Sequence, residues 1–343
     1  MNLALIFGGK SAEHEVSLRS AKNIYSALDK DKFSPVLIGI TKRGGWFYFD
    51  RIPEREVKNN GRRVSLIPGS DEWLSVNGKK MDVEVVFPIL HGPNGEDGTI
   101  QGLLKLLDVP FVGADSLSSA VAMDKEVSKI LLQNKGLKVA DWITFKREAD
   151  IEKIENRFDY PLFVKPSNLG SSVGVSKVKN KRQLKKAIDL AFTYDEKILI
   201  EEFIDGKELE CSVLGNKDPQ ASPIGEIKPK DKFYSYEEKY SDESKTELIV
   251  PAEINSDLER EIQKKAVKAF KSNMCTGMAR VDFLVTDEEI YVNELNTIPG
   301  FTKISMYPKL WQEENLSYRG LISRLIELAI EEHEDSKKLK NDH

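Results

Sequence analysis

The sequence predicts a protein of α/β and α+β class that is divided into three domains, and two patterns carry this prediction. In the first third of the chain, short apolar runs alternate with amphipathic segments and end in turn residues, as in an open, mostly parallel sheet covered by helices. Farther along, strand-like runs flank single helical segments, as in α+β domains. With 343 residues, 40% of them hydrophobic, the chain is long enough to form several hydrophobic cores.

The first predicted domain covers residues 1–121 and holds the open sheet. Residues 43–80 contain glycine- and proline-rich turns and many charges, so we expect a small hairpin-rich insertion there. Ser17 is the expected N-cap of the first helix. The expected elements, in chain order, are a strand at 3–7, a helix at 17–28, strands at 35–40 and 83–90, a helix at 98–107 and a strand at 109–113.

The second predicted domain covers residues 122–215, and we expect it to close over a ligand as a small α+β unit. Gly136 ends its first helix, and Asn180 is the expected N-cap of its second. The expected elements are a helix at 123–133, strands at 161–165 and 173–178, a helix at 181–191 and strands at 198–203 and 209–215.

The third predicted domain covers residues 216–343 and contains a long polar segment at 231–246. Such a loop in a compact domain is usually functional or disordered, and its three tyrosines favour a lid that excludes water over a disordered surface. The expected elements are a strand at 224–228, a helix at 256–272, strands at 278–285 and 290–295 and a closing helix at 318–330.

The composition excludes several classes of protein. A formal net charge of -5 gives no general attraction to a polyphosphate backbone, so we expect no nucleic-acid partner. No apolar run approaches the roughly 20 residues of a membrane span, and the start lacks the basic region of a signal peptide. Cys211 and Cys275 form no disulfide framework or metal motif, which favours buried thiols in a reducing cytoplasm.

Two acidic residues on neighbouring predicted strands favour a magnesium-nucleotide site. Asp282 and Glu294 lie in runs that alternate like strands, so both carboxylates would face one side of a hairpin, with Asn296 nearby. Magnesium prefers such oxygen ligands. Arg280 would lie beside them, where its planar cation suits a transition state that builds negative charge on oxygen. The alternative, a pair of exposed strands with solvated charges, explains an isolated Arg-Val-Asp but not the whole set.

Glycines and serines follow the strand that contains Lys165. In the run Gly170-Ser171-Ser172-Val173-Gly174, backbone N–H groups and hydroxyls can approach phosphate oxygens closely, although such hairpins are common without function. A lysine on an apolar strand requires an anionic partner, which strengthens the phosphate interpretation. The next strand ends in Glu201-Glu202, where a free strand edge and carboxylates can bind adenine and ribose, or can simply be solvated.

Two polar turns follow predicted strands of the first domain. Glu13 and His14 lie in the turn after the first strand, and His91 begins the turn after the strand at 83–90. Ligands in open α/β sheets bind at the carboxyl ends of strands. His91 alone favours a structural turn histidine, whereas the two turns together predict a shared pocket.

Taken in order, these motifs resemble the D-alanine–D-alanine ligase family of the ATP-grasp superfamily, over essentially the whole chain. The resemblance rests on six segments: 8–17, 91–98, 123–125, 165–174, 238–240 and 296–300. It implies a three-domain ATP-grasp architecture in which ATP phosphorylates the carboxylate of a first D-alanine and the amine of a second attacks the acyl phosphate. ADP and phosphate are released, and the dipeptide enters peptidoglycan synthesis. A ligase that uses D-lactate or D-serine as second substrate is the alternative; a regulator that binds nucleotide without catalysis is disfavoured because the charged positions are retained.

The resemblance also implies residue roles. Glu13 would hold the first substrate's ammonium group, and Ser171 and Tyr240 would link it to the lid; Arg280 and the Gly300 N–H would stabilise the oxyanion. The remaining implied contacts are His91, Ser305 and Met306 for the second substrate; Lys125, Lys165, Lys239 and Ser172 for phosphate; Glu201, Glu202, Ile204 and Glu208 for adenine and ribose; and Asp282, Glu294 and Asn296 for two Mg²⁺ or Mn²⁺ ions. The family further suggests a homodimer, and a tyrosine at position 240 favours an amine nucleophile.

Overall fold

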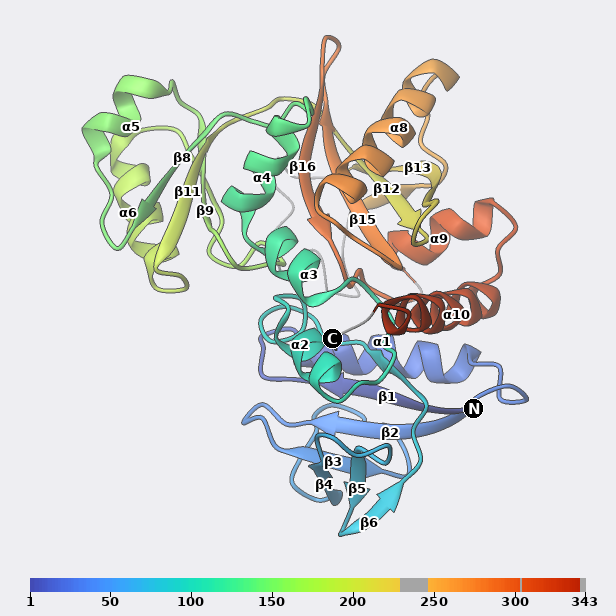
Figure 1. Cartoon of the computed structure of the whole chain (residues 1–343). Helices are drawn as coiled ribbons and strands as arrows, with labels where there is room; N and C mark the ends of the chain where they lie inside the picture. The colour runs from blue at the N-terminus through green and yellow to red at the C-terminus, as the bar shows by residue number, and fades with distance from the viewer. Residues whose placement is uncertain (229–245, 303, 340–343) are drawn as a thin grey trace.

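A computed structural model describes residues 1–228, 246–302 and 304–339, and three sheets organise this part of the chain (Figure 1). The sheets have seven, four and five strands and follow one another along the sequence. The predicted polar segment at 231–246, with Lys239 and Tyr240, lies outside the described residues except for its last position. The predicted mixed α/β and α+β class is confirmed.

The N-terminal sheet has the order β6-β5-β4-β3-β2-β1-β7. Only β2, β1 and β7 are parallel to one another, whereas the pairs from β2 to β6 are antiparallel. Residues 43–80 form hairpins as predicted, but these extend the main sheet instead of forming a separate insertion, so the sheet is mixed rather than mostly parallel. Its strands are β1 (Asn2–Gly8), β2 (Ser34–Ile40), β3 (Trp46–Phe49), β4 (Arg62–Leu66), β5 (Leu74–Val76), β6 (Lys79–Met81) and β7 (Val85–Pro88).

Helix α1 (His14–Ala27) begins three residues before the predicted N-cap, so the prediction for Ser17 was wrong. Ser17 is buried inside the helix, where its hydroxyl accepts a hydrogen bond from Gly8 N and donates one to Ile89 O. The serine therefore ties the ends of β1 and β7 together. His14 is also structural, because its Nε2 accepts from Val57 N at 3.1 Å and its Nδ1 lies 2.7 Å from Gly9 O.

Three helices lead from the first sheet to the second: α2 (Thr99–Leu106), α3 (Ser116–Met123) and α4 (Lys125–Asn134). The helix predicted at 123–133 begins at Lys125, and the carboxylate of Asp124 caps it by accepting from the N–H groups of Glu126 and Val127. Helix α3 was not predicted, because its Ser-rich sequence is a weak helix former. The chain then enters the four-stranded sheet.

The central sheet has the order β10-β9-β11-β8 and packs against two helices on one face, at the left of Figure 1. Asn180 caps α6 by accepting from Gln183 N, as predicted. Strand β8 and helix α5 were not predicted. The elements are β8 (Trp142–Lys146), α5 (Ile151–Arg157), β9 (Leu162–Pro166), β10 (Ser176–Val178), α6 (Lys181–Phe192) and β11 (Lys197–Glu202).

The C-terminal sheet has the order β14-β13-β12-β15-β16. Strand β12 was assigned to the central domain from the sequence, but it pairs with β13 and β15, so the strands of the central sheet end at Glu202. Helix α8 has the predicted bounds, and α9 was missed. The elements are β12 (Lys207–Leu214), β13 (Gln220–Lys228), β14 (Glu247–Ile249), α8 (Ser256–Ser272), β15 (Met278–Val285), β16 (Ile290–Asn296), α9 (Met306–Glu313) and α10 (Tyr318–Lys337).

The two ends of the described chain share one hydrophobic core. Leu5 and Phe7 of β1 belong to the same buried cluster as Leu321 and Ile326 of α10. Helix α10 lies beside α1, on the same face of the N-terminal sheet (Figure 1). The third part of the chain is thereby fixed to the first. This packing brings the loops at the carboxyl ends of β1 and β7 next to the end of β16.

Cys211 and Cys275 are both buried and unpaired, as the composition predicted. Burial raises the pKa of each thiol to about 12, so both remain protonated at neutral pH. Among the residues that the structure covers, no helix is both long and apolar enough to cross a membrane.

Candidate active site

The β15–β16 hairpin places the predicted metal ligands together. Asp282 pairs directly with Glu294 across the hairpin, so both carboxylates face the same side of the sheet, as predicted. The amide of Asn296 donates to Asp282 Oδ2 at 3.0 Å. These side chains provide two carboxylates and one amide oxygen, a donor set that suits Mg²⁺. No group of three or more His, Cys, Asp or Glu side chains is arranged for a metal ion within the described residues.

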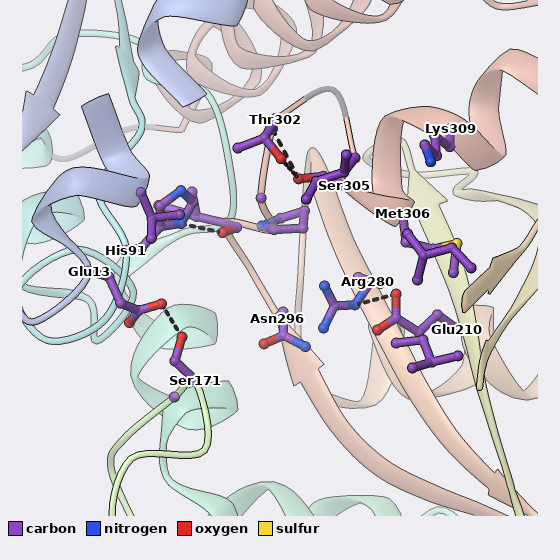
Figure 2. A pocket seen from close by; sticks show the side chains of 18 of the residues that line it. Glu13, His91, Ser171, Glu210, Arg280, Asn296, Thr302, Ser305, Met306 and Lys309 are labelled. Carbon is purple, nitrogen blue, oxygen red and sulfur yellow. Dashed lines mark hydrogen bonds and ion pairs between the residues drawn. The ribbon is translucent and has the colours of Figure 1, made fainter. Parts of the chain in front are cut away.

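Arg280 lies between two carboxylates on this face. Its Nε and Nη2 donate to the two oxygens of Asp282 at 2.7 Å each, and its Nε lies 3.2 Å from Glu210 Oε2 on β12. Figure 2 shows the guanidinium between Glu210 and Asn296. Burial alone would lower the pKa of Arg280, but Asp282 and Glu210 raise it well above its usual value. We call Arg280, Asp282 and Glu210 the arginine cluster.

The loop after β9 meets the turn after β1. Ser171 and Ser172 adopt positive φ angles of 54° and 58°, and the Ser171 hydroxyl donates to the carboxylate of Glu13 (Figure 2). Glu13 is buried at the start of α1. The structure therefore brings together the first two members of the predicted link, while the third, Tyr240, lies outside the described residues.

His91 is buried beneath the same region. Its Nδ1 lies 3.2 Å from Ile298 O, and its Nε2 lies 3.2 Å from the Ser20 hydroxyl. Burial lowers the pKa of His91 and outweighs the opposing effect of Glu13, so the imidazole is neutral near pH 7. A neutral ring that donates from Nδ1 to the carbonyl accepts from Ser20 at Nε2. These contacts fix the ring between the first and third parts of the chain.

Glu96, which was not predicted as a site residue, is adjacent to Glu13 and His91 in the cavity wall. Its Oε2 accepts from Gly92 N at 2.7 Å. Burial, together with the nearby carboxylate of Glu13, raises the pKa of Glu96 to about 8. Two buried acidic side chains in one enclosure repel each other when both are ionised, so the pair favours a cation between them.

The predicted second-substrate contacts follow β16. Ser305 accepts from Thr302 N at 3.0 Å, and its Oγ would lie only 2.8 Å from a Cβ at position 300, so Gly300 permits this close approach. Met306 begins α9 and packs over Gly225, where an added Cβ would meet its sulfur at 2.4 Å. Glycine at both positions therefore shapes the wall that Ser305 and Met306 form.

One cavity of about 470 Å³ collects these side chains from all three parts of the chain. It is lined by the predicted residues Glu13, His91, Ser171, Arg280, Glu294, Asn296, Gly300, Ser305 and Met306. It is also lined by residues that were not predicted, among them Arg19, Glu96, Glu210 and Lys309.

A second group of charges lies between α4 and the central sheet. Lys165 Nζ is 2.6 Å from Glu201 Oε2, and Lys129 Nζ is 3.2 Å from the other oxygen. Burial by itself would raise the pKa of Glu201, but the two lysines lower it to about 2. We call Lys129, Lys165 and Glu201 the lysine cluster. Lys129 was not predicted; it lies in the buried stripe of α4, where a lysine is unusual.

The other predicted nucleotide contacts have different surroundings. Lys125 Nζ donates to Leu169 O at 2.6 Å and lies 3.7 Å from Glu294 Oε2, which places it between the glycine- and serine-rich loop and the hairpin. Glu202 accepts from Asp141 N at 2.8 Å. Ile204, which follows β11, and Glu208, which lies in β12, are both half-buried. The side chains of Glu201 and Glu202 thus have structural partners, so a nucleotide contact there would use the backbone of the strand. Lys239 lies outside the described residues.

The three sheets have the arrangement of an ATP-grasp ligase. The glycine- and serine-rich loop lies between the lysine cluster and the acidic β15–β16 hairpin. Two family models match the chain: D-ala D-ala ligase N-terminus over residues 2–114 and D-ala D-ala ligase C-terminus over residues 131–327. The chain belongs to the D-alanine–D-alanine ligase family. The family and the ATP-dependent ligase activity predicted from the sequence are confirmed.

Relatives agree over nearly the full length. A D-alanine–D-alanine ligase from Shouchella clausii is 50% identical over 99% of this chain and 97% of its own. The structure of the D-alanine-D-alanine ligase from Coxiella burnetii has a TM-score of 0.88 and 37% identity, covering 98% and 96% of the two chains. The VanG D-Ala:D-Ser ligase from Enterococcus faecalis has a TM-score of 0.87 and 39% identity, covering 96% and 99%.

Proposed function

We propose that this enzyme joins two D-alanine molecules through an acyl phosphate, with release of ADP and phosphate, and thereby supplies a dipeptide for peptidoglycan precursors. The observation that carries the proposal is the single cavity in which Glu13, Ser171, Arg280 and Ser305 meet from separate parts of the chain. A ligation needs both amino acids beside one phosphoryl donor, because positioning supplies much of the rate enhancement.

The acidic end of the cavity is the proposed site for the first amino group. Glu13, oriented by the Ser171 hydroxyl, would pair with the ammonium group, and Glu96 would add a second carboxylate. A buried carboxylate pair of this kind gains its compensating charge from the bound amine. The carboxylate of the first substrate would then point towards the hairpin, where phosphate is delivered.

Arg280 and the Gly300 N–H are the proposed oxyanion-stabilising groups. Both line the cavity. Preorganised donors at the position where an oxyanion develops contribute roughly 10²- to 10³-fold to turnover each. Ser305 and Met306, with His91 behind them, would bind the second amino acid so that its amine attacks the acyl carbon.

Lys125 and Lys165 are the proposed phosphate-binding lysines, with Lys129 behind Lys165 in the lysine cluster and Ser172 donating from the loop. Asp282, Glu294 and Asn296 would hold two Mg²⁺ or Mn²⁺ ions, and the donor set and its placement on one face of the hairpin fit such ions. Bound ions of this type neutralise phosphate charge and polarise the transferred phosphoryl group. In this proposal Lys239 binds phosphate and Tyr240 belongs to the lid. We also propose that the enzyme is a cytoplasmic homodimer.

The function is tested with purified protein, ATP, Mg²⁺ and D-alanine. We expect phosphate release that matches D-alanyl-D-alanine formation one to one, measured by a phosphate assay and mass spectrometry. Absence of the dipeptide, with turnover on another amino acid, would reject the substrate assignment.

The similarity to the VanG D-Ala:D-Ser ligase makes D-serine the second candidate for the attacking amino acid. A competition between D-alanine, D-serine and D-lactate at several pH values separates these possibilities. We expect D-alanyl-D-alanine as the main product, and a dominant mixed product would favour the alternative.

A further inference from the structure

Glu210 is a buried carboxylate that the roles assigned above do not use. It lies on β12, directly opposite Asp282 of β15, which in turn pairs with Glu294 of β16. Three carboxylates therefore form a row across neighbouring strands on the cavity side of the sheet. The side chain of Glu210 is only 4% exposed. Burying a carboxylate is costly unless it is paired, so this position calls for an explanation.

Charge balance does not supply that explanation. Asp282 alone already engages Arg280 with two hydrogen bonds of 2.7 Å, which is the favoured bidentate geometry for a guanidinium and a carboxylate. Glu210 adds a second carboxylate at 3.2 Å from the same Nε. The arginine cluster thus contains one cation and two anions.

The surroundings of Glu210 point towards the substrate. Its pairing partner on β13 is Gly225. Met306, at the cavity wall, occupies the space that a side chain at position 225 would fill. Glu210 and Arg280 both line the cavity, whereas Asp282 is absent from its lining. Glu210 therefore holds the guanidinium from the cavity wall, and Asp282 holds it from the neighbouring position on the same face of the sheet.

We propose that Glu210 is a positioning residue that holds the Arg280 guanidinium at the cavity wall when Asp282 serves as a metal ligand. This inference rests on the proposed function of Arg280. A divalent cation on Asp282 repels a guanidinium that shares the same carboxylate. Glu210 gives Arg280 a second anionic partner, so the guanidinium keeps its place beside the reacting carbonyl instead of rotating away.

The test compares Glu210→Gln with Glu226→Gln in the full-length protein. Glu226 is the matched control, because it is also a buried glutamate of the same sheet but pairs with Leu209, whose side chain lies in the core beneath the other face. We expect Glu210→Gln to lower kcat by about 10-fold or more, because Arg280 loses a buried anionic partner, while the KM for ATP changes less than about 2-fold. Glu226→Gln should keep the wild-type kcat.

Two further measurements separate positioning from a general structural effect. Calorimetry with a tetrahedral phosphinate analogue of the dipeptide, in the presence of ADP and Mg²⁺, should show weaker binding to Glu210→Gln without any turnover. In an Arg280→Ala background, Glu210→Gln should have little further effect on kcat, because its partner is gone. Glu210→Asp, which keeps the charge, should recover part of the activity if Glu210→Gln folds poorly.

The outcomes distinguish the inference from the function beneath it. A wild-type protein that makes no D-alanyl-D-alanine overturns the proposed function. Wild-type turnover together with full kcat and full phosphinate affinity in Glu210→Gln overturns the positioning role alone. Equal losses in Glu210→Gln and Glu226→Gln, or an undiminished effect in the Arg280→Ala background, also overturn it.

Discussion

The lysine cluster and the arginine cluster are both buried ion groups, yet they differ in the ratio of cations to carboxylates among their members. Lys129 and Lys165 share one carboxylate, Glu201, whereas Arg280 is shared by two, Asp282 and Glu210. An excess of one sign in a buried group favours a ligand of the opposite sign beside it. The lysine cluster suits an anionic phosphate, and the arginine cluster suits a divalent cation. The comparison teaches that surplus charge in a buried group indicates what binds beside it.

The largest effect is expected for a substitution in the arginine cluster. Arg280→Ala should lower kcat by roughly 10²-fold or more, because it removes a preorganised cation from the oxyanion, while the Kd for ATP stays nearly unchanged. Phosphate release and calorimetric titration with ATP measure the two quantities. Equal loss of both would show that Arg280 contacts the nucleotide, and the two clusters would then share one ligand.

The lysine side is tested by Glu201→Gln. Removing the shared carboxylate leaves two buried lysines unpaired, so we expect a loss of about 3–5 kcal/mol in the free energy of unfolding near pH 7. The pKa of Glu201 is lowered from 4.5 to about 2, so its contribution is present above pH 4.5 and is lost as the pH falls towards 2. Urea unfolding at several pH values checks both statements.

Lys129→Met is the matched variant for this experiment, because it leaves Lys165 and Glu201 as a balanced pair. It should destabilise the protein less than Glu201→Gln does. Saturating ATP should reduce the loss of unfolding free energy in Glu201→Gln, because the phosphate charge replaces the missing carboxylate. A greater loss in Lys129→Met would contradict the surplus-charge interpretation of this cluster.

A smaller effect is expected at the acidic end of the cavity. The folded-state pKa of Glu96 is raised from 4.5 to about 8, so ionising it in the folded protein costs stability as the pH rises through that interval. Glu96→Gln should therefore be more stable than the wild type at pH 9, by at least about 1 kcal/mol. Thermal unfolding from pH 5 to pH 9 measures this. If the melting temperatures of the two proteins change in parallel with pH, the pKa of Glu96 is not raised.

Ser171→Ala gives the smallest expected change. It removes one hydrogen bond to Glu13, worth about 1 kcal/mol, and should raise the KM for the first D-alanine roughly fivefold with little change in kcat. Steady-state kinetics with D-alanine as the varied substrate measures it. An unchanged KM would mean that the Glu13 carboxylate is held equally well without the serine.

The sequence predicted the hairpin well, because its strands alternate clearly and end at strong turn residues. The bounds of β15 and the pairing of Asp282 with Glu294 follow from that alternation. The same reasoning failed for Ser17, since a serine near a helix start has the same appearance whether it caps the helix or ties two strands together. Only the tertiary contact distinguishes the two cases.

The missed residues share a physical cause. Glu96, Lys129 and Glu210 acquire their significance from burial, which a local pattern does not report. The sequence spacing indicated two of them. Lys129 lies four residues after Lys125 and therefore on the same side of α4. Glu210 lies two residues from Glu208 and Ser212 and therefore on the same face of β12. The pairing of β12 with β15, which gives Glu210 its partner, joins segments about 70 residues apart and was not predicted.

The core shared by β1 and α10 has a consequence for how the protein is made. The N-terminal sheet and α1 leave the ribosome first, but α10, which completes the buried cluster of Leu5 and Phe7, is synthesised last. During elongation this cluster lacks part of its native cover, and exposed apolar surface of this kind favours aggregation. Synthesis of nearly the whole chain must therefore precede completion of its first structural unit.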